Sequence, residues 1–265
     1  SLPGAALGRP IQAGGLVLFA WGGRNKGGVS ALELHSGKTR WEYSLPNMVR
    51  GVSVAGNLAV FACQAGYNHP GMLAAVDLQS GEKAWHEISL SGSVFHAPLV
   101  YENRRVFLAA CPGKLQCFSL PDGEEIEFGH TLDLKAAQTQ KVWLCNCGGI
   151  LVVLQKDGQI HLRNTHNLEP AWNETLSVQA EISGPPLVTN QQVYFGVSPG
   201  KLAVLEPRRA KLRILAGGFG KIASTPAWQD DHLWLSAQDH CLYEILPEDG
   251  SSVRHWQFAR SPVMS

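Results

Sequence analysis

The chain alternates short apolar runs with tight turns. Residues 97–100 and 106–109 form one pair of such runs, and residues 186–188 and 193–196 form another. Short apolar runs bounded by glycine, proline and polar residues are typical of β-strands. A small residue and a proline lie near the start of the first run, where the N–H that proline lacks falls at the strand end. The pattern predicts short, turn-connected strands along the whole chain.

A longer pattern repeats on top of this alternation. Residues 31–42 read Ala-Leu-Glu-Leu-His-Ser-Gly-Lys-Thr-Arg-Trp-Glu, and residues 75–86 read Ala-Val-Asp-Leu-Gln-Ser-Gly-Glu-Lys-Ala-Trp-His. A third copy surrounds Gly123, a sixth runs from Tyr243 to Trp256, and the two between them are degenerate. Self-similar units of about 40 to 45 residues, built from strands, are the signature of β-propeller blades.

Each repeat holds four strands, which we name a to d in chain order. The sequence therefore predicts an all-β fold, a β-propeller of about six four-stranded antiparallel blades. We expect residues 1–265 to form one propeller domain, excised from a larger bacterial protein. Residues 259–263 look like the start of another strand a, although residues 9–12 already supply one for the first blade. We favour six blades, with seven as the alternative if part of one blade lies outside this sequence.

The run from Ala75 to Trp85 closely resembles the repeat of the pyrroloquinoline-quinone-like propeller family, whose core is Ala-x-Asp-x-x-(Thr/Ser)-Gly-x-x-x-Trp. The resemblance implies that Gly37 and Gly81 take positive φ angles in the turn between strands c and d. It also implies that Trp41 and Trp85 wedge between neighbouring sheets.

Some members of that family are quinone dehydrogenases. They look like eight-bladed propellers with a vicinal cysteine disulfide over the cofactor and an acidic cluster that holds calcium. Here the nearest cysteines, Cys145 and Cys147, are separated by Asn146, and no acidic cluster stands out. The chain is more similar to the noncatalytic members, which act as periplasmic assembly scaffolds or as sensor and docking domains. We therefore expect no cofactor.

Composition narrows the range of partners. The chain has 22 basic and 22 acidic residues, which gives no electrostatic basis for binding nucleic acid or an anionic membrane. The first residues show neither a signal peptide nor a membrane span. Six cysteines without the spacing of a secreted framework favour reduced thiols and the cytoplasm, or the periplasm if a leader was removed. Cys145 and Cys147 could supply only half of a zinc site, so we expect no metal.

Two adjacent long loops form the first candidate site. Residues 21–28 and 64–71 connect strands b and c in the first two blades, and the equivalent loops of the third, fifth and sixth blades are shorter. Glycine-rich loops can merely tolerate insertions, but aromatic and arginine side chains on rigidly mounted loops are typical of binding surfaces. We expect one contact patch for a protein partner or a small ligand. Its residues are Trp21, Arg24, Asn25, Tyr67, Asn68 and His69.

The second candidate site lies where each strand a begins, at one mouth of the propeller channel. Alignment of the strand starts brings Arg50, His96 and Arg260 to the same level. Basic side chains at a channel mouth favour an anionic or carboxylate partner. The alternative is that they bond only neighbouring carbonyl groups or water.

The sequence contains no serine-hydrolase elbow, phosphate-binding loop or zinc-protease motif. We therefore expect a noncatalytic scaffold or sensor domain that binds a protein partner, or the rest of its own polypeptide, on the long-loop face. One alternative is an enzyme acting on an anionic sugar or peptide, with His96 as acid or base and Arg50 as anion clamp. Another is a periplasmic assembly scaffold of the outer-membrane lipoprotein type.

Overall fold

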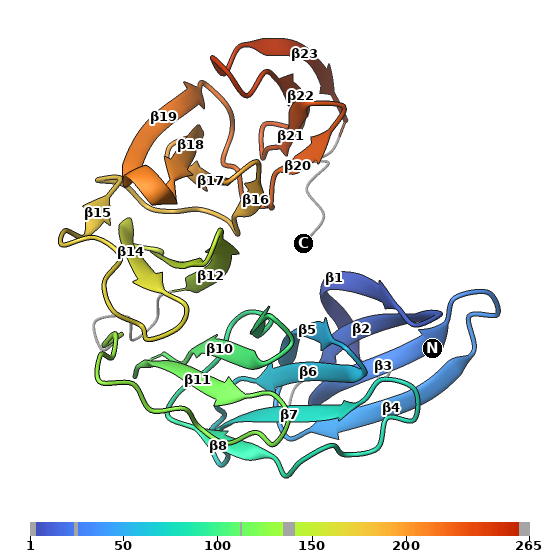
Figure 1. The fold of residues 1–265 in the computed structure, drawn as a ribbon. Coiled ribbons are helices and arrows are strands. Elements are labelled where there is room, and N and C mark those ends of the chain that lie inside the picture. The colour runs from blue at the N-terminus through green and yellow to red at the C-terminus, as the bar shows by residue number, and fades with distance from the viewer. Residues whose placement is uncertain (1–3, 24–25, 112, 135–140, 260–265) are drawn as a thin grey trace. The chain divides into compact units, whose positions relative to one another are not determined.

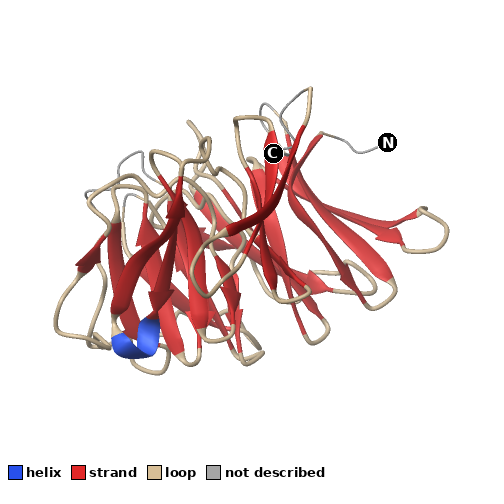
Figure 2. Ribbon diagram, turned by 90° about the horizontal axis from the view of Figure 1, so that it is seen from above, coloured by secondary structure: helices blue, strands red, loops and turns tan. Residues whose placement is uncertain are grey.

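The computed structural model describes residues 4–23, 26–111, 113–134 and 141–259. Its regular structure is almost entirely β-strand, with a single 3₁₀ turn in the described residues at Pro207–Arg209 (Figures 1 and 2). None of the described helical residues forms a segment long and apolar enough to cross a membrane. The strands assemble into six antiparallel sheets, numbered 1 to 6 in chain order, which confirms the all-β prediction.

The chain divides into two compact units, of which unit 1 covers residues 1–142. It contains sheets 1 to 3, whose strands follow in chain order. Sheet 1 consists of β1 (Ala5–Ala13), β2 (Leu16–Gly22), β3 (Gly27–Glu33) and β4 (Thr39–Leu45). Sheet 2 consists of β5 (Val49–Ala55), β6 (Leu58–Cys63), β7 (Gly71–Asp77) and β8 (Ile88–Leu90). Sheet 3 consists of β9 (Leu99–Tyr101), β10 (Arg105–Ala109) and β11 (Leu115–Ser119).

Unit 2 covers residues 143–265 and holds sheets 4 to 6, with the first residue of β12 belonging to unit 1. Sheet 4 consists of β12 (Val142–Cys147), β13 (Ile150–Gln155), β14 (Gln159–Asn164) and β15 (Leu176–Ser177). Sheet 5 consists of β16 (Leu187–Thr189), β17 (Gln192–Val197), β18 (Lys201–Glu206) and β19 (Lys211–Gly217). Sheet 6 consists of β20 (Ala227–Gln229), β21 (His232–Ser236), β22 (Cys241–Ile245) and β23 (Ser252–Gln257).

Sheet 3 departs from the predicted four strands. In the described part of the chain after β11, Glu125 and Asp133 form only isolated bridges, to Phe118 and Lys114. The expectation of four strands per repeat is therefore correct for five sheets and wrong for sheet 3. The third repeat carries Glu127 at the position that tryptophan holds in the first two, so its outer segment lacks the aromatic anchor.

The turn that follows the third strand contains a residue with a positive φ angle in all six sheets. Gly37 and Gly81 have φ angles of 66° and 72°, as the family resemblance implied. Sheets 4 and 5 place Leu168 and Ala210 at this position, with φ angles of 58° and 48°. The N–H of Leu168 donates to the carbonyl of Asn164 at 2.9 Å, as Gly81 donates to Asp77 at the same distance. The degenerate repeats therefore keep the turn without its glycine.

Tryptophan side chains join each sheet to the next at three places within the units. Trp41 Nε1 donates to the Leu78 carbonyl at 2.8 Å, and Trp85 Nε1 donates to the Leu120 carbonyl at 3.1 Å. In unit 2, Trp172 Nε1 donates to the Pro207 carbonyl at 2.8 Å. Each acceptor directly follows the third strand of the next sheet. The implied wedging of Trp41 and Trp85 between sheets is thus confirmed.

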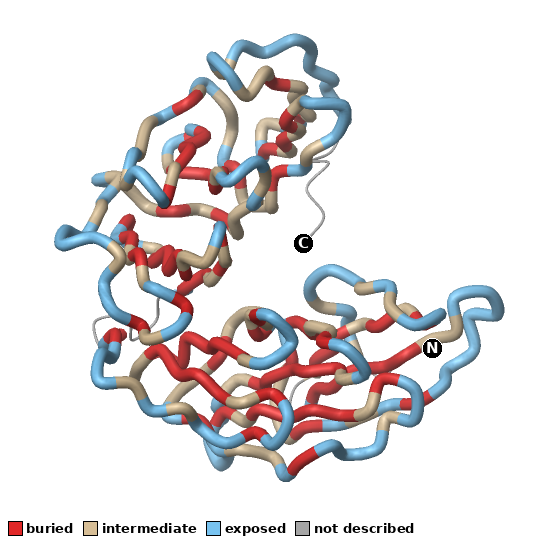
Figure 3. The backbone as a smooth tube through the Cα atoms, viewed as in Figure 1, coloured by how far each residue is buried: buried red, intermediate tan, exposed pale blue. Residues whose placement is uncertain are grey.

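Apolar side chains fill the space between neighbouring sheets of the same unit, and buried positions follow the strands (Figure 3). Leu18 and Ala31 of sheet 1 pack in one cluster with Phe61 of sheet 2. Leu162 of sheet 4 shares a cluster with Phe195 of sheet 5. Alternation along each strand places these side chains on one face, which explains why the apolar runs predicted the strands.

Polar side chains also connect sheets 1 and 2, beside the apolar contacts between them. The hydroxyl of Tyr43 donates to Glu87, and Lys83 Nζ lies 2.7 Å from Glu87 Oε2. The hydrogen bonds from Lys83 and Tyr43 lower the pKa of Glu87 to about 2. Burial and the neighbouring carboxylate raise the pKa of Tyr43 to about 12. At neutral pH the Glu87 carboxylate is therefore a charged acceptor and the Tyr43 hydroxyl is a neutral donor.

Candidate functional site

The long loop of sheet 2, between β6 and β7, presents its tip to solvent. Tyr67 is fully exposed, and Asn68 and His69 are exposed beside it. The loop is held by backbone contacts: the N–H of Ala65 donates to Ser93 Oγ at 3.0 Å, and the N–H of Gly66 donates to the His69 carbonyl at 2.8 Å. The structure thus places three of the six predicted patch residues together on an anchored loop.

Trp21 has a different place from the one expected. It lies next to the last residue of β2 with 1 % of its surface exposed, so it is a core residue and the prediction of a surface contact is wrong. Its ring occupies room left by glycine: a Cβ added to Gly28 would lie 2.8 Å from Trp21 Cζ2, and one added to Gly4 would lie 3.2 Å from Trp21 Cε3. Lys26 Nζ lies 6.0 Å from the ring centroid. Arg24 and Asn25 lie outside the described residues.

In unit 1 the backbone around Gly8 of β1 lies next to Arg50 of β5, and Gly51 of β5 lies next to Ala97, which precedes β9. A Cβ on Gly8 would lie 2.5 Å from the Arg50 carbonyl oxygen, and one on Gly51 would lie 2.7 Å from Cβ of Ala97. Arg50 and His96 immediately precede Gly51 and Ala97. They therefore share one level of unit 1, and Arg50 is exposed there. Arg260 lies outside the described residues.

The surroundings of His96 are cationic. Burial, followed by the positive charges of Lys141 and Arg50, lowers the pKa of His96 to about 3. A neutral imidazole with so low a pKa is a weak base at neutral pH, which counts against its use in acid–base catalysis. Lys141 is a neighbour that sequence reasoning missed. Its position just before β12, where the fourth strand-a start was expected, was the available signal.

The cysteines are packing residues. All six are unbridged and buried. Cys145 and Cys147 lie in β12 rather than in the turn, which Gly148 and Gly149 form with positive φ angles. Burial raises the pKa of both thiols, which makes them poor nucleophiles. Across residues 4–259, apart from the undescribed positions, no group of three or more histidine, cysteine or acidic residues could hold a metal ion.

Two surface pockets lie between neighbouring sheets of one unit. A pocket of about 560 Å³ in unit 1 has Lys83, Trp85 and Glu124 in its wall. Another, of about 380 Å³ in unit 2, has Arg213 and Trp228 in its wall. Neither of these two pockets is lined by a residue predicted for the loop patch or the channel mouth.

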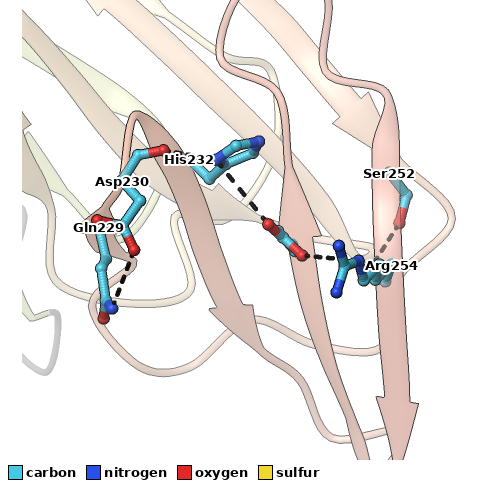
Figure 4. Close-up of polar contacts among 6 residues, drawn as sticks. Gln229, Asp230, His232, Ser252 and Arg254 are labelled. Carbon is cyan, nitrogen blue, oxygen red and sulfur yellow. Dashed lines mark hydrogen bonds and ion pairs between the residues drawn. The ribbon is translucent and has the colours of Figure 1, made fainter.

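Sheet 6 holds an ionic cluster that the sequence analysis did not anticipate (Figure 4). Glu244 Oε1 lies 3.9 Å from His232 Nδ1, and Glu244 Oε2 lies 3.7 Å from Arg254 Nε. In strand register, Glu244 pairs with Arg254 as Ala31 pairs with Trp41 in sheet 1. Arg254 thus occupies the tryptophan position of the repeat. The sixth repeat keeps its turn glycine, but its tryptophan is displaced by two residues to position 256.

Comparison with known proteins identifies the family. The model of the family described as outer membrane protein assembly factor BamB matches residues 1–133, which is half of the chain. The chain belongs to this PQQ-like β-propeller family. No protein of curated function matches it.

Solved structures agree on the fold. BamB from Moraxella catarrhalis has a TM-score of 0.72 at 17% identity, covering 96% of this chain and 76% of that one. The computationally designed Ika8 protein has a TM-score of 0.68 at 13% identity, covering 98% and 90%. The propeller domain of Myceliophteria thermophila Cps50 (Swd1) has a TM-score of 0.65 at 14% identity, covering 95% and 89%. The β-propeller prediction is confirmed, and identities this low speak for the fold alone.

Proposed function

We propose that this chain is a noncatalytic propeller scaffold that binds a protein partner through the loop of residues 64–70. The observation that carries the proposal is the full exposure of Tyr67 at the tip of an anchored loop. Aromatic side chains on a held backbone gain contact area while losing little conformational entropy on binding. Family membership supports a scaffold, since the matching family is described as an assembly factor.

The compartment is part of the proposal. Buried, unbridged cysteines agree with a reducing environment and hence with the cytoplasm. The periplasmic alternative draws on the description of the matching family, which names outer membrane assembly for its members. The binding chemistry proposed for Tyr67 is the same in either compartment.

The test places a photo-crosslinking benzoylphenylalanine at position 67 in the full chain. We expect crosslinked adducts with a defined partner that excess unlabelled wild-type protein prevents. Excess Tyr67→Ala, Asn68→Ala, His69→Ala triple variant should not prevent them. Benzoylphenylalanine at the exposed Glu82 is the matched control. Equal competition by wild-type and triple variant would show that this loop is not the contact surface.

A second candidate ligand is a small anion at the level of Arg50 and Lys141. The cationic surroundings of His96 favour it, because a bound anion would offset the charges that lower the pKa of His96. The test is an NMR titration of the His96 ring in the wild-type chain with and without inorganic phosphate. A pKa that rises with phosphate supports the candidate, and one that is unchanged at millimolar phosphate rejects it.

A further inference from the structure

The last strand of unit 2 is exposed along its whole length. β23 is the edge strand of sheet 6 (Figure 1), and all six of its residues are exposed. Val253 and Trp256 are 42% and 38% exposed, and Phe258 just beyond the strand is 44% exposed. The outer strands of sheets 1 and 5 bury at least one apolar side chain each. Apolar groups gathered on an exposed edge mark an interaction surface.

The side chains of this edge are held in place before any partner arrives. Trp256 stacks on Trp234 with ring centroids 5.4 Å apart and planes 18° from parallel. Arg254 is tied to Glu244, and Ser252 Oγ contacts the Arg254 carbonyl at 3.4 Å (Figure 4). Tryptophan and arginine are the side chains most often responsible for binding energy at protein interfaces. Fixed rotamers reduce the entropy that binding would cost.

The backbone of β23 offers donors to a further strand. The N–H of Phe258 donates inward to the His240 carbonyl at 2.8 Å. Because N–H groups alternate in direction along an antiparallel strand, those of Arg254 and Trp256 also point to β22. Those of His255 and Gln257 point to the free edge of the sheet. The outer edge can therefore pair with another extended segment.

Charge indicates what kind of segment fits. β23 contains Arg254 and His255 and no acidic residue. Arg254 keeps 70% of its side chain exposed although it pairs with Glu244. Arg254 and Trp256 lie two residues apart and therefore share one face of the sheet. A segment with an acidic and an apolar residue two positions apart would meet Arg254 with its carboxylate and Trp256 with its apolar side chain.

We propose that β23 is a docking edge at which an extended, acidic and apolar segment of a partner protein adds to sheet 6 as a fifth strand. This surface is separate from the loop of residues 64–70, so either proposal can fail alone. Strand addition takes its affinity from main-chain hydrogen bonds and its specificity from alternate side chains.

The test uses fluorescence anisotropy with the full chain and a short synthetic peptide in which glutamate and phenylalanine stand two residues apart, with valine between them. One control peptide is methylated on alternate backbone nitrogens, and another replaces glutamate by lysine. Gln257→Pro removes one outward N–H without touching the ladder to β22, a position where an edge strand tolerates proline. Gln257→Ala is its matched control, and thermal unfolding verifies that both variants fold.

We expect the acidic peptide to bind, with affinity reduced about tenfold by backbone methylation or by Gln257→Pro and nearly unchanged by Gln257→Ala. The lysine peptide should bind far more weakly. Absence of binding, or equal binding of the methylated peptide, overturns strand addition. Equal binding of the lysine peptide overturns the assigned chemistry. If the wild-type chain is a dimer and Gln257→Pro converts it to a monomer, β23 pairs with a second copy of this chain. That result would overturn the proposed partner.

Discussion

Two physical demands meet at Gly81. Its φ angle of 72° lies in the left-handed region, where a side chain costs free energy. The indole of Trp41 also packs directly against it, so that an added Cβ would lie 2.5 Å from Trp41 Cγ. Gly123 repeats this arrangement with Trp85, 2.8 Å from the added Cβ to Trp85 Cδ2. In these two turns the motif glycine thus serves both the turn and the packing of the preceding sheet.

We predict that Gly81→Ala destabilises the chain more than Gly56→Ala does. Gly56 has a similar φ angle of 57° but nothing within 4 Å of an added Cβ, so it measures the backbone cost alone. That cost is about 1 kcal/mol, whereas Gly81→Ala adds overpacking of Trp41 for a total of about 2 to 4 kcal/mol. Urea unfolding of both variants gives the comparison. Equal losses would mean that Trp41 moves aside without cost.

Leu168 shows what residue-level reasoning from sequence could not supply. Its φ angle of 58° is strained for leucine, yet its side chain is 2% exposed. Burial of a leucine side chain contributes about 2 kcal/mol, which offsets a strain of about 1 kcal/mol. The sequence predicted the glycine turns from their residue type. It could not predict this turn, because the compensation comes from packing.

At the scale of the element, the tryptophan contacts show which repeats use their tryptophan to join neighbouring sheets. Sheets 1, 2 and 4 each donate an indole N–H to the next sheet. In sheet 6 the same position is occupied by Arg254, which forms an ion pair with Glu244 of its own sheet. A repeat thus retains tryptophan at this position where the described structure uses it between sheets.

We predict that Trp85→Phe destabilises the chain by about 1 to 3 kcal/mol, because the buried Leu120 carbonyl loses its donor while most of the ring area is kept. Trp256→Phe should cost less than about 1 kcal/mol, since Trp256 is partly exposed and only stacks on Trp234. Denaturant midpoints of both variants provide the measurement. If the two variants lose equal stability, the indole hydrogen bond is not a stabilising link between sheets.

The candidate loops show which features of a site can be predicted from the lengths of strands and loops. Loop length correctly predicted an exposed tip at Tyr67, because a connection longer than its turn must leave the sheet. It failed for Trp21, because length does not say which side chain turns inward. That choice depends on the space beside Gly4 and Gly28, which only the folded chain defines. The structure brings the backbone beside Arg50 close to the backbone beside His96, and the anion site suggested at this level stays a prediction.

For the whole molecule, the repeat predicted six sheets and their order. The repeat did not predict the number of strands in sheet 3, because the third repeat keeps its turn glycine and the sequence does not show where strand pairing stops. The boundary between the units falls inside a strand, since unit 1 ends at Val142 and β12 continues through Cys147. Domain boundaries normally fall in exposed linkers with few contacts. Only Val142, the first residue of β12, falls in unit 1. The same repeat runs through both units, and this continuity favours the prediction of one domain.

We therefore predict that residues 1–265 unfold in one cooperative transition. Hydrogen exchange measured by mass spectrometry across a urea series reports the protection of the backbone amides of β6 in unit 1 and of β17 in unit 2 separately. Both strands should lose protection at the same urea concentration if residues 1–265 form one cooperative domain. Trp172→Ala, which breaks the contact to Pro207 in unit 2, should lower the midpoint of both strands together. The exposed Glu174→Ala, in the segment between β14 and β15, is the matched control and should shift neither. A shift confined to β17 would show that the units unfold independently and that the single-domain prediction is wrong.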